Sequence, residues 1–154
     1  MITLRKANKE DIPKLWDFEK ENRLFDRKLL GSKFKQSFSW DINKKEEQTW
    51  KEVIKKDLQK QNHLFLVAEE KIQVGYIWGY YNKNKKGYIN EVFVTKKQRG
   101  KKISSLLMKE MLKWFKKNKI TTISLHVFAP NEHAIMIYKK WGFIPFSLDM
   151  KKKL

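Results

Sequence analysis

The chain has 154 residues, a length that fits one domain. Its 41% hydrophobic and 14% aromatic content excludes a disordered chain, and the lack of cysteine excludes a disulfide framework and a thiolate metal site. Lys and Arg number 35 against 17 Asp and Glu, a formal charge of +18, which attracts polyanions such as nucleic acid, anionic lipid or a phosphorylated small molecule. A lysine-rich composition that has no functional role gives the same formal charge, so the charge by itself does not identify the function.

The sequence gives no sign of a membrane segment. No apolar run approaches the length of a bilayer span, and no apolar signal segment follows Met1. We therefore expect one domain over residues 1–154, located in the cytoplasm, without a membrane partner, as a monomer or a homodimer.

The first elements in chain order are a strand and two helices. Alternation over 2–7 predicts the strand. The range 8–25 predicts a helix, with Asp11 as its N-cap and Pro13 in its first turn. The range 29–45 carries Gly, Ser and Asp and predicts an irregular connection. Helical periodicity returns over 46–62.

Three short-linked strands follow, at 63–70, 74–83 and 87–95, and their turns predict antiparallel pairing. An apolar stripe predicts a helix over 103–119. A β-branched strand at 120–129, a helix at 131–141 ended by Gly142, and a last strand at 143–154 complete the chain.

This order, β-α-α-β-β-β-α-β-α-β, predicts an α/β (α+β) fold. The helix at 103–119 must connect its two flanking strands by a right-handed crossover, so those strands are parallel neighbours. The central sheet is therefore mixed and mostly antiparallel, with helices on both faces.

A basic loop precedes the helix at 103–119. The stretch 95–111 reads "TKKQRGKKISSLLMKEM". The first turn of a helix has N–H groups without an intrahelical partner and a partial positive charge, so it suits a phosphate. Gly100 lets the backbone approach an anion closely, and Arg99, Lys101 and Lys102 add charge. Taken alone, the same pattern also fits a solvated helix face.

The residues around this loop make the chain resemble the GCN5-related N-acetyltransferase (GNAT) superfamily. The loop resembles the family's pattern of Arg or Gln, two residues, Gly, one residue, then Gly or Ala. In this frame Lys102 stands where the family usually has Gly, and Ser104 where it has Gly or Ala. The resemblance implies that acetyl-CoA binds here, with the pyrophosphate on backbone amides that stay available if residue 102 does not take a positive φ. The implied cofactor-binding residues of this segment are Val92, Phe93, Val94, Arg99, Gly100, Lys101, Lys102, Ile103 and Ser104.

A second stretch carries the resemblance further. Asn131, Ala134, Tyr138 and Gly142-Phe143 lie at the spacing of the family's Asn-x-x-Ala-x-x-x-Tyr signature ending in Gly-Phe. On a helix the first three share one face, which can line the cofactor. The resemblance implies cofactor contacts from Asn131, Ala134 and Tyr138. It spans nearly the whole chain and is weakest between Asp26 and Asn62.

The resemblance implies direct transfer of an acetyl group from acetyl-CoA to a primary amine. Tyr138 is then the expected proton donor to the departing thiolate. A backbone N–H of the strand Val92–Val94, where the family's sheet splays open, is expected to stabilise the oxyanion. For the base, His126 and Glu91 stay alternatives beside water; an imidazole takes up a proton near neutral pH. Each of these three side chains also has a purely structural interpretation.

The acceptor and two rival functions stay open. The acceptor is a small amine or a protein or peptide amine, and aromatic residues of the first connection are candidates to contact it: Phe25, Phe34, Phe38, Trp40 and Trp50. One rival is a basic module that binds nucleic acid or ribosomes through its lysines. The other is an acyl-CoA-binding regulator. The three histidines have no metal-ligand spacing, so we expect no metal.

Overall fold

The computed structural model describes residues 1–31, 42–152 and 154. The predicted acceptor contacts Phe34, Phe38 and Trp40 lie outside these residues. Two compact units make up the chain: Met1–Asn22 with Trp40–His126, and Arg23–Ser39 with Val127–Leu154.

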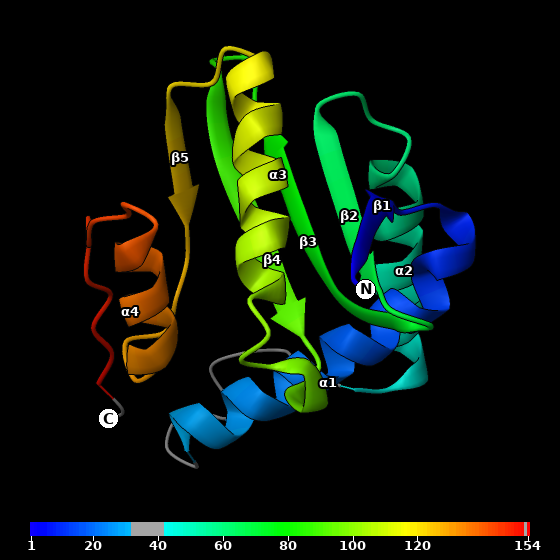
Figure 1. Ribbon diagram of the computed structural model, residues 1–154. Coiled ribbons are helices and arrows are strands. Elements are labelled where there is room, and N and C mark those ends of the chain that lie inside the picture. The colour runs from blue at the N-terminus through cyan, green and yellow to red at the C-terminus, as the bar shows by residue number, and fades with distance from the viewer. Residues whose placement is uncertain (32–41, 153) are drawn as a thin grey trace. The chain divides into compact units, whose positions relative to one another are not determined.

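The first unit is built on a five-stranded sheet in the order β1-β2-β3-β4-β5 (Figure 1). Its strands are β1 (Thr3–Lys6), β2 (His63–Glu69), β3 (Gln73–Tyr81), β4 (Lys86–Val94) and β5 (Thr122–Leu125). The first three pairings are antiparallel, and β4 pairs with β5 in parallel. The predicted mixed, mostly antiparallel sheet with one parallel pair is confirmed.

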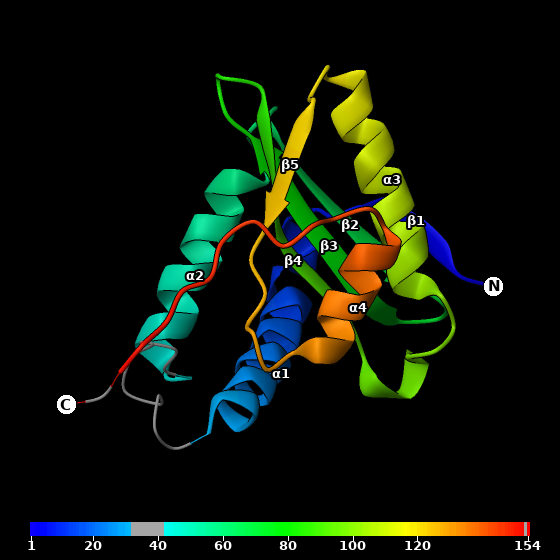
Figure 2. The ribbon, with the colours of Figure 1, turned by 90° about the vertical axis from the view of Figure 1, so that its left-hand side faces the viewer.

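Helices cover both faces of this sheet, as predicted. Helix α3 (Ile103–Lys117) lies on one face, and helix α2 (Lys44–Asp57) with the first turns of α1 (Ile12–Leu30) lies on the other (Figures 1 and 2). Side chains alternate between the faces because a strand has a period of two. On the α1/α2 face the core contains Leu15, Phe18, Ile54, Val67 and Tyr76.

The start of α1 differs from the prediction. Asn8, not Asp11, is the N-cap, of the 3₁₀ turn η1 (Lys9–Asp11) that precedes α1, and the helix then runs on to Leu30. Asp11 is buried instead, because its carboxylate accepts both guanidinium nitrogens of Arg5 at 2.7 and 2.8 Å and the N–H of Asn8 at 2.7 Å. A local sequence pattern cannot reveal this partner from another element.

The second unit contains α4 (Glu132–Lys140), which ends as predicted at Gly142. Gly142 has φ 88°, and its N–H bonds to the Lys139 carbonyl while the Phe143 N–H bonds to the Tyr138 carbonyl, both at 3.0 Å. These two bonds form a Schellman motif, which requires a positive φ at this residue.

The prediction of a last strand at 143–154 is wrong for the described residues. Residues 143–152 form neither helix nor strand, and Phe146 and Met150 are 97% and 82% exposed. The alternation of apolar residues gives only a preference for strand, whereas a strand needs a paired neighbour. Pro145 also removes one N–H from any ladder.

Candidate active site at the open edge of β4

A β-bulge shapes the middle of β4. Trp78 of β3 lies opposite Glu91, whereas the next residue, Gly79, lies opposite Ile89. Asn90 therefore has no opposite residue, and a bulge of this kind bends and twists its strand. Pairing of β4 with β5 ends at the same place, at Ile89 and Leu125. Beyond it Val92–Val94 pairs with β3 only, and we call this segment the open edge of β4.

The open edge presents backbone groups on the side away from β3. The Thr95 N–H donates to the Val74 carbonyl at 2.9 Å, and peptide groups of an antiparallel pair alternate in direction. Those of Val92 and Val94 therefore point to the open side. The Val94 carbonyl accepts Arg99 Nε there at 3.2 Å. The Phe93 side chain is buried against Phe18, with ring centroids 5.0 Å apart, so any cofactor contact of this residue would come from its backbone.

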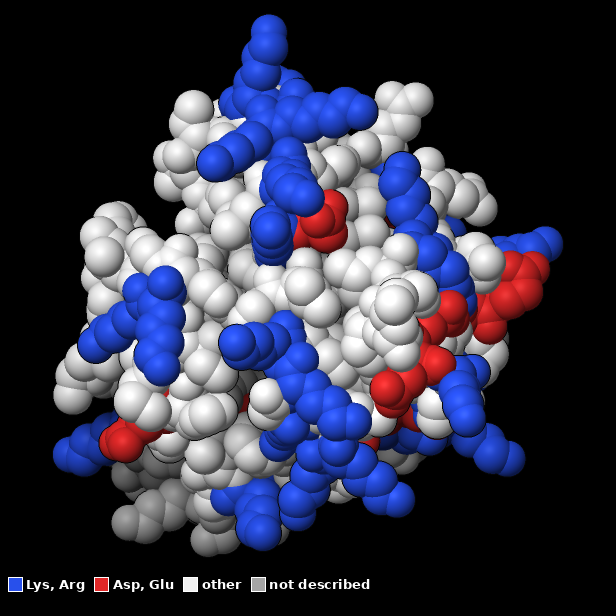
Figure 3. Space-filling view, in the orientation of Figure 1, with Lys and Arg blue, Asp and Glu red and all other residues white. Residues whose placement is uncertain are grey.

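The basic loop joins β4 to α3 through the short turn η3 (Lys96–Gln98). Among the described residues no side chain caps the N-terminus of α3, whereas Asn43 caps α2 and Asn131 caps α4. The first N–H groups of α3 are thus left for another acceptor. Arg99, Lys101 and Lys102 are exposed beside them, and Ile103 is buried while Ser104 is half-buried. Figure 3 shows Lys and Arg gathered near this end of α3.

The sequence prediction of a phosphate site assumed that residue 102 does not take a positive φ, and the backbone at Lys102 contradicts this. Residue 102 does take a left-handed conformation, with φ 60° and ψ 16°, and Gly100 has φ 83°. This geometry explains why Gly suits position 102, since a side chain there costs about 1–2 kcal/mol. The strain does not block the amides, because the Lys102 carbonyl still accepts the Leu106 N–H at 3.1 Å and starts the helix.

Of the two predicted bases, Glu91 lies in the sheet and His126 lies just beyond it. Glu91 lies opposite Trp78 on the α1/α2 face, and its Oε1 accepts Asn22 Nδ2 from α1 at 2.7 Å. Tyr88 lies opposite Ser124 of β5. His126 follows directly after the end of β5 and is exposed. Glu91 is half-buried, so it is the more enclosed of the two.

The second signature lies in the second unit, along α4. Asn131 Oδ1 accepts the Ala134 N–H at 3.2 Å, so this part of the signature is also a helix cap. Tyr138 is half-buried, with ring centroids 5.9 Å from Trp141 and 6.1 Å from Phe143. The Tyr–Gly–Phe part of the signature thus forms the Schellman end of the helix. The signature residues thus form both ends of α4.

Sequence reasoning did not identify Asn22 as a partner of Glu91. A signal existed, because Leu15, Phe18 and Asn22 follow a helical spacing of three and four residues. A polar residue that continues a buried apolar stripe commonly has a polar partner.

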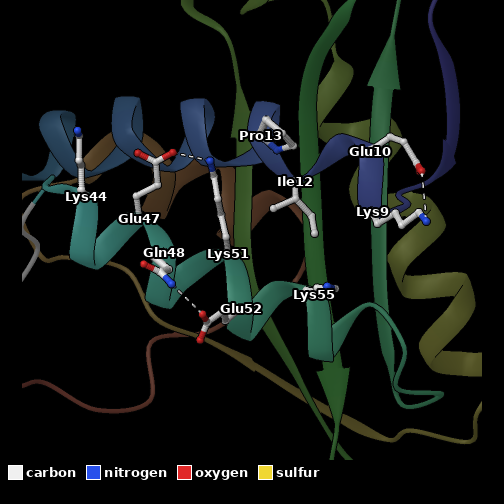
Figure 4. Close-up of a pocket in the computed structure, with 10 residues that line it drawn as sticks. All are labelled: Lys9, Glu10, Ile12, Pro13, Lys44, Glu47, Gln48, Lys51, Glu52 and Lys55. Atoms are coloured by element: carbon white, nitrogen blue, oxygen red, sulfur yellow. Dashed lines mark hydrogen bonds and ion pairs between the residues drawn. The ribbon is translucent and has the colours of Figure 1, made fainter.

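A groove between η1, α1 and α2 is separate from these residues (Figure 4). Its volume is about 730 Å³, and two ion pairs line it: Lys51 with Glu47, and Lys9 with Glu10. Gln48 donates to Glu52 at 3.3 Å. These interactions indicate no reaction or ligand for the groove.

Two features are absent from the described residues. Over 1–31 and 42–152, no three His, Asp or Glu side chains gather as a metal-ligand set. None of the helices in the described part of the chain is long and apolar enough to cross a bilayer.

Comparison with known proteins agrees with this geometry. Residues 17–143 match the acetyltransferase (GNAT) family. The uncharacterized N-acetyltransferase YdgE of Bacillus subtilis is 26% identical over 115 residues, which cover 71% of this chain and 73% of YdgE.

Solved structures show the same fold. A tetramutant of the BH1408 protein from Bacillus halodurans superposes with a TM-score of 0.81 at 17% identity, over 99% of both chains. The PaiA N-acetyltransferase from Thermoplasma acidophilum, solved in complex with coenzyme A, superposes with a TM-score of 0.74 at 22% identity, over 97% of this chain and 93% of its own. The chain belongs to the acetyltransferase (GNAT) family.

Proposed function

We propose that this protein is an N-acetyltransferase that moves an acetyl group from acetyl-CoA to a primary amine by direct attack. The observation that carries the proposal is that two sets of backbone hydrogen-bonding groups lie in the same unit. The open edge of β4 offers backbone groups, and the N-terminus of α3 offers uncapped N–H groups beside exposed cations. An extended amide chain that ends in phosphates fits this pair of features.

The proposed binding roles follow from these positions. The peptide groups of Val92 and Val94 would pair with the pantetheine amides as a neighbouring strand would. The first N–H groups of α3 would hold the pyrophosphate, with Arg99, Lys101 and Lys102 adding charge. Asn131 and Ala134 are proposed to line the cofactor from α4. No metal is needed for these contacts.

The chemistry requires the amine nitrogen to form a bond to the thioester carbon while the carbon–sulfur bond breaks. The negative charge that develops on the thioester oxygen would be met by a backbone N–H at the open edge, for which Val92 is the candidate. Tyr138 would give its phenol proton to the sulfur. The amine proton would pass to Glu91, to His126 or to water.

Glu91 is our preferred base. Its carboxylate is half-buried and oriented by Asn22, whereas His126 is exposed. The need for a base depends on the acceptor. A lysine-like amine costs about 4–5 kcal/mol to deprotonate at pH 7, and an α-amine costs about 1 kcal/mol.

The roles are tested by turnover and binding measured together. Tyr138→Phe should lower kcat by about 10²–10⁴-fold and leave acetyl-CoA affinity unchanged. Tyr81→Phe is the matched control, since Tyr81 donates to Asn118 on the α3 face. Weaker acetyl-CoA binding with unchanged kcat in Tyr138→Phe would refute the acid role.

The base is tested separately by pH–rate profiles of Glu91→Gln and His126→Ala. We expect Glu91→Gln to remove the acidic limb of kcat/KM and His126→Ala to keep it. The reverse result would assign the base to His126, and an unchanged limb in both variants would assign the proton to water.

A further inference from the structure

Aromatic side chains form a row across three strands on the α1/α2 face. His63 of β2 lies opposite Tyr80 of β3, which lies opposite Tyr88 of β4. Their rings stack, with centroids 5.1 Å apart in each pair and interplanar angles of 17° and 21°. We call these three residues the aromatic row.

A second row lies beside the first and ends in the candidate base. Phe65, Trp78 and Glu91 lie opposite one another on β2, β3 and β4. Phe65 and Trp78 stack at 4.8 Å. Because residues i and i+2 of a strand share a face, both rows lie on the α1/α2 face. The two rows are two residues apart along β3, a rise of roughly 7 Å.

Helices bury only part of this face. Phe65, Val67 and Tyr76 are at most 4% exposed under α1 and α2. Trp78, Tyr80 and Tyr88, toward the bulge and β5, are half-buried. Ser124, opposite Tyr88, is exposed. Tyr80 is stacked between His63 and Tyr88, so the accessible part of the row is the edge of Tyr80 and the side of Tyr88 turned toward Ser124.

A hydrogen bond from the second row orients His63 of the aromatic row. Trp78 Nε1–H donates to His63 Nδ1 at 3.4 Å, which requires a neutral imidazole. Burial lowers the pKa of His63, and this outweighs the opposite pull of Asp57, whose Oδ2 lies 3.8 Å from Nδ1. An ordered aromatic surface costs little entropy to use in binding.

The composition of this face selects among amines. Stacked rings favour a flat apolar body and attract an ammonium group, and Glu91 supplies a carboxylate. A polycation would meet the repulsion of a chain with formal charge +18.

We infer that the acceptor is a monoamine attached to an aromatic body, whose ring packs on Tyr88 and on the edge of Tyr80 and whose nitrogen reaches the site beside Glu91. This inference rests on the proposed function and specifies its acceptor. Tyr80 and Tyr88 are then specificity-determining residues of the reaction. The spacing of roughly 7 Å between the rows suits a short linker between ring and amine.

The test compares acceptors and variants of the full chain. Free-thiol release from acetyl-CoA is measured with 2-phenylethylamine, with butylamine as an apolar amine without a ring, and with spermidine as a polycation. We expect the highest kcat/KM for 2-phenylethylamine. Tyr80→Leu should lower that value about two- to tenfold, through KM, because an aromatic contact is worth about 0.5–1.5 kcal/mol beyond its area.

Tyr81→Leu is the matched control, because Tyr81 is the adjacent Tyr of β3 and packs on Trp114 of the opposite face. It should change stability and leave the preference among amines unchanged. Calorimetric titration of acetyl-CoA into each variant separates the two proposals.

Preference for spermidine, no preference among the amines, or an equal loss in Tyr80→Leu and Tyr81→Leu would overturn the acceptor assignment. Normal acetyl-CoA binding without acetylation of any of the three amines would overturn it and leave the cofactor site standing. Absence of acetyl-CoA binding in the wild type would instead show that the proposed function itself has failed.

Discussion

At the scale of single residues, Lys102 holds a left-handed backbone at the N-cap of α3. Lys102→Gly removes the clash of a Cβ, worth about 1–2 kcal/mol, and adds about 0.5–1 kcal/mol of chain entropy to the unfolded state. We expect a net gain of about 0.5–1 kcal/mol in the free energy of unfolding, measured by denaturant titration. Lys101→Gly, at a neighbouring exposed residue without positive φ, should destabilise. A loss in both variants would show that the loop relaxes to another conformation.

Asp11 links stability to pH. The hydrogen bonds from Arg5 hold the pKa of this buried carboxyl below its ordinary value. The unfolded state therefore binds the proton more tightly, so the contribution to stability is complete above about pH 4. It is lost as pH falls through the lower folded pKa.

We expect Asp11→Asn to cost about 2 kcal/mol at pH 7, as hydrogen bonds to charged groups do, and to flatten the decline below about pH 4. Thermal unfolding between pH 3 and pH 7 checks both effects. Asp17→Asn, on an exposed carboxylate that pairs with Lys20 at 2.9 Å, should keep the wild-type profile. An unchanged acid decline in Asp11→Asn would contradict the assigned linkage.

At the scale of elements, the bulge in β4 separates the paired part of the strand from its open edge. Deleting Asn90 would place Ile89 and Glu91 in sequence opposite Gly79 and Trp78, which restores a regular ladder without turning Glu91 to the other face. The ladder with β5 could then continue along the edge. We expect stability to be kept and acetyl-CoA affinity to fall about tenfold, the equivalent of one backbone hydrogen bond.

Calorimetry and thermal unfolding of the deletion variant test this together. Deletion of Asn84, in the turn between β3 and β4, is the control for shortening the hairpin. Full affinity after deletion of Asn90 would mean that the bulge does not create the binding edge.

The elements also show what the sequence could predict. Strong periodicity placed α3 and the strands β2 to β4 correctly, because each is set by its own apolar pattern. The bulge was missed, because it exists only as a mismatch between two strands. The last strand was wrong for the same kind of reason, since Ile144, Phe146 and Leu148 alternate but have no ladder.

The candidate site was predictable where it depends on local chemistry. The phosphate site proposed at Gly100 and the cations before α3 could be predicted, because a glycine and basic residues before a helix suit a phosphate. The positive φ of Lys102, the bond from Asn22 to Glu91 and the aromatic row depend on backbone geometry or on partners distant in sequence. Such features emerge only when the sheet is assembled.

At the scale of the whole molecule, the formal charge of +18 separates two kinds of binding. Lysines near both ends of α3 (Figure 3) attract any polyanion through long-range forces, which salt screens beyond about 8–10 Å. A specific cofactor site adds backbone hydrogen bonds and a fixed stoichiometry. Salt weakens such hydrogen bonds far less than it weakens the long-range attraction. Nucleic acid would bind through the first mechanism only.

The most direct test of the central claim is calorimetric titration of acetyl-CoA into the purified protein across a salt series, with dephospho-CoA and a nucleic acid as comparisons. We predict saturable one-to-one binding that survives moderate salt. Weak binding that salt abolishes, matched by any polyanion, would contradict it and make the segment before α3 only a charged surface.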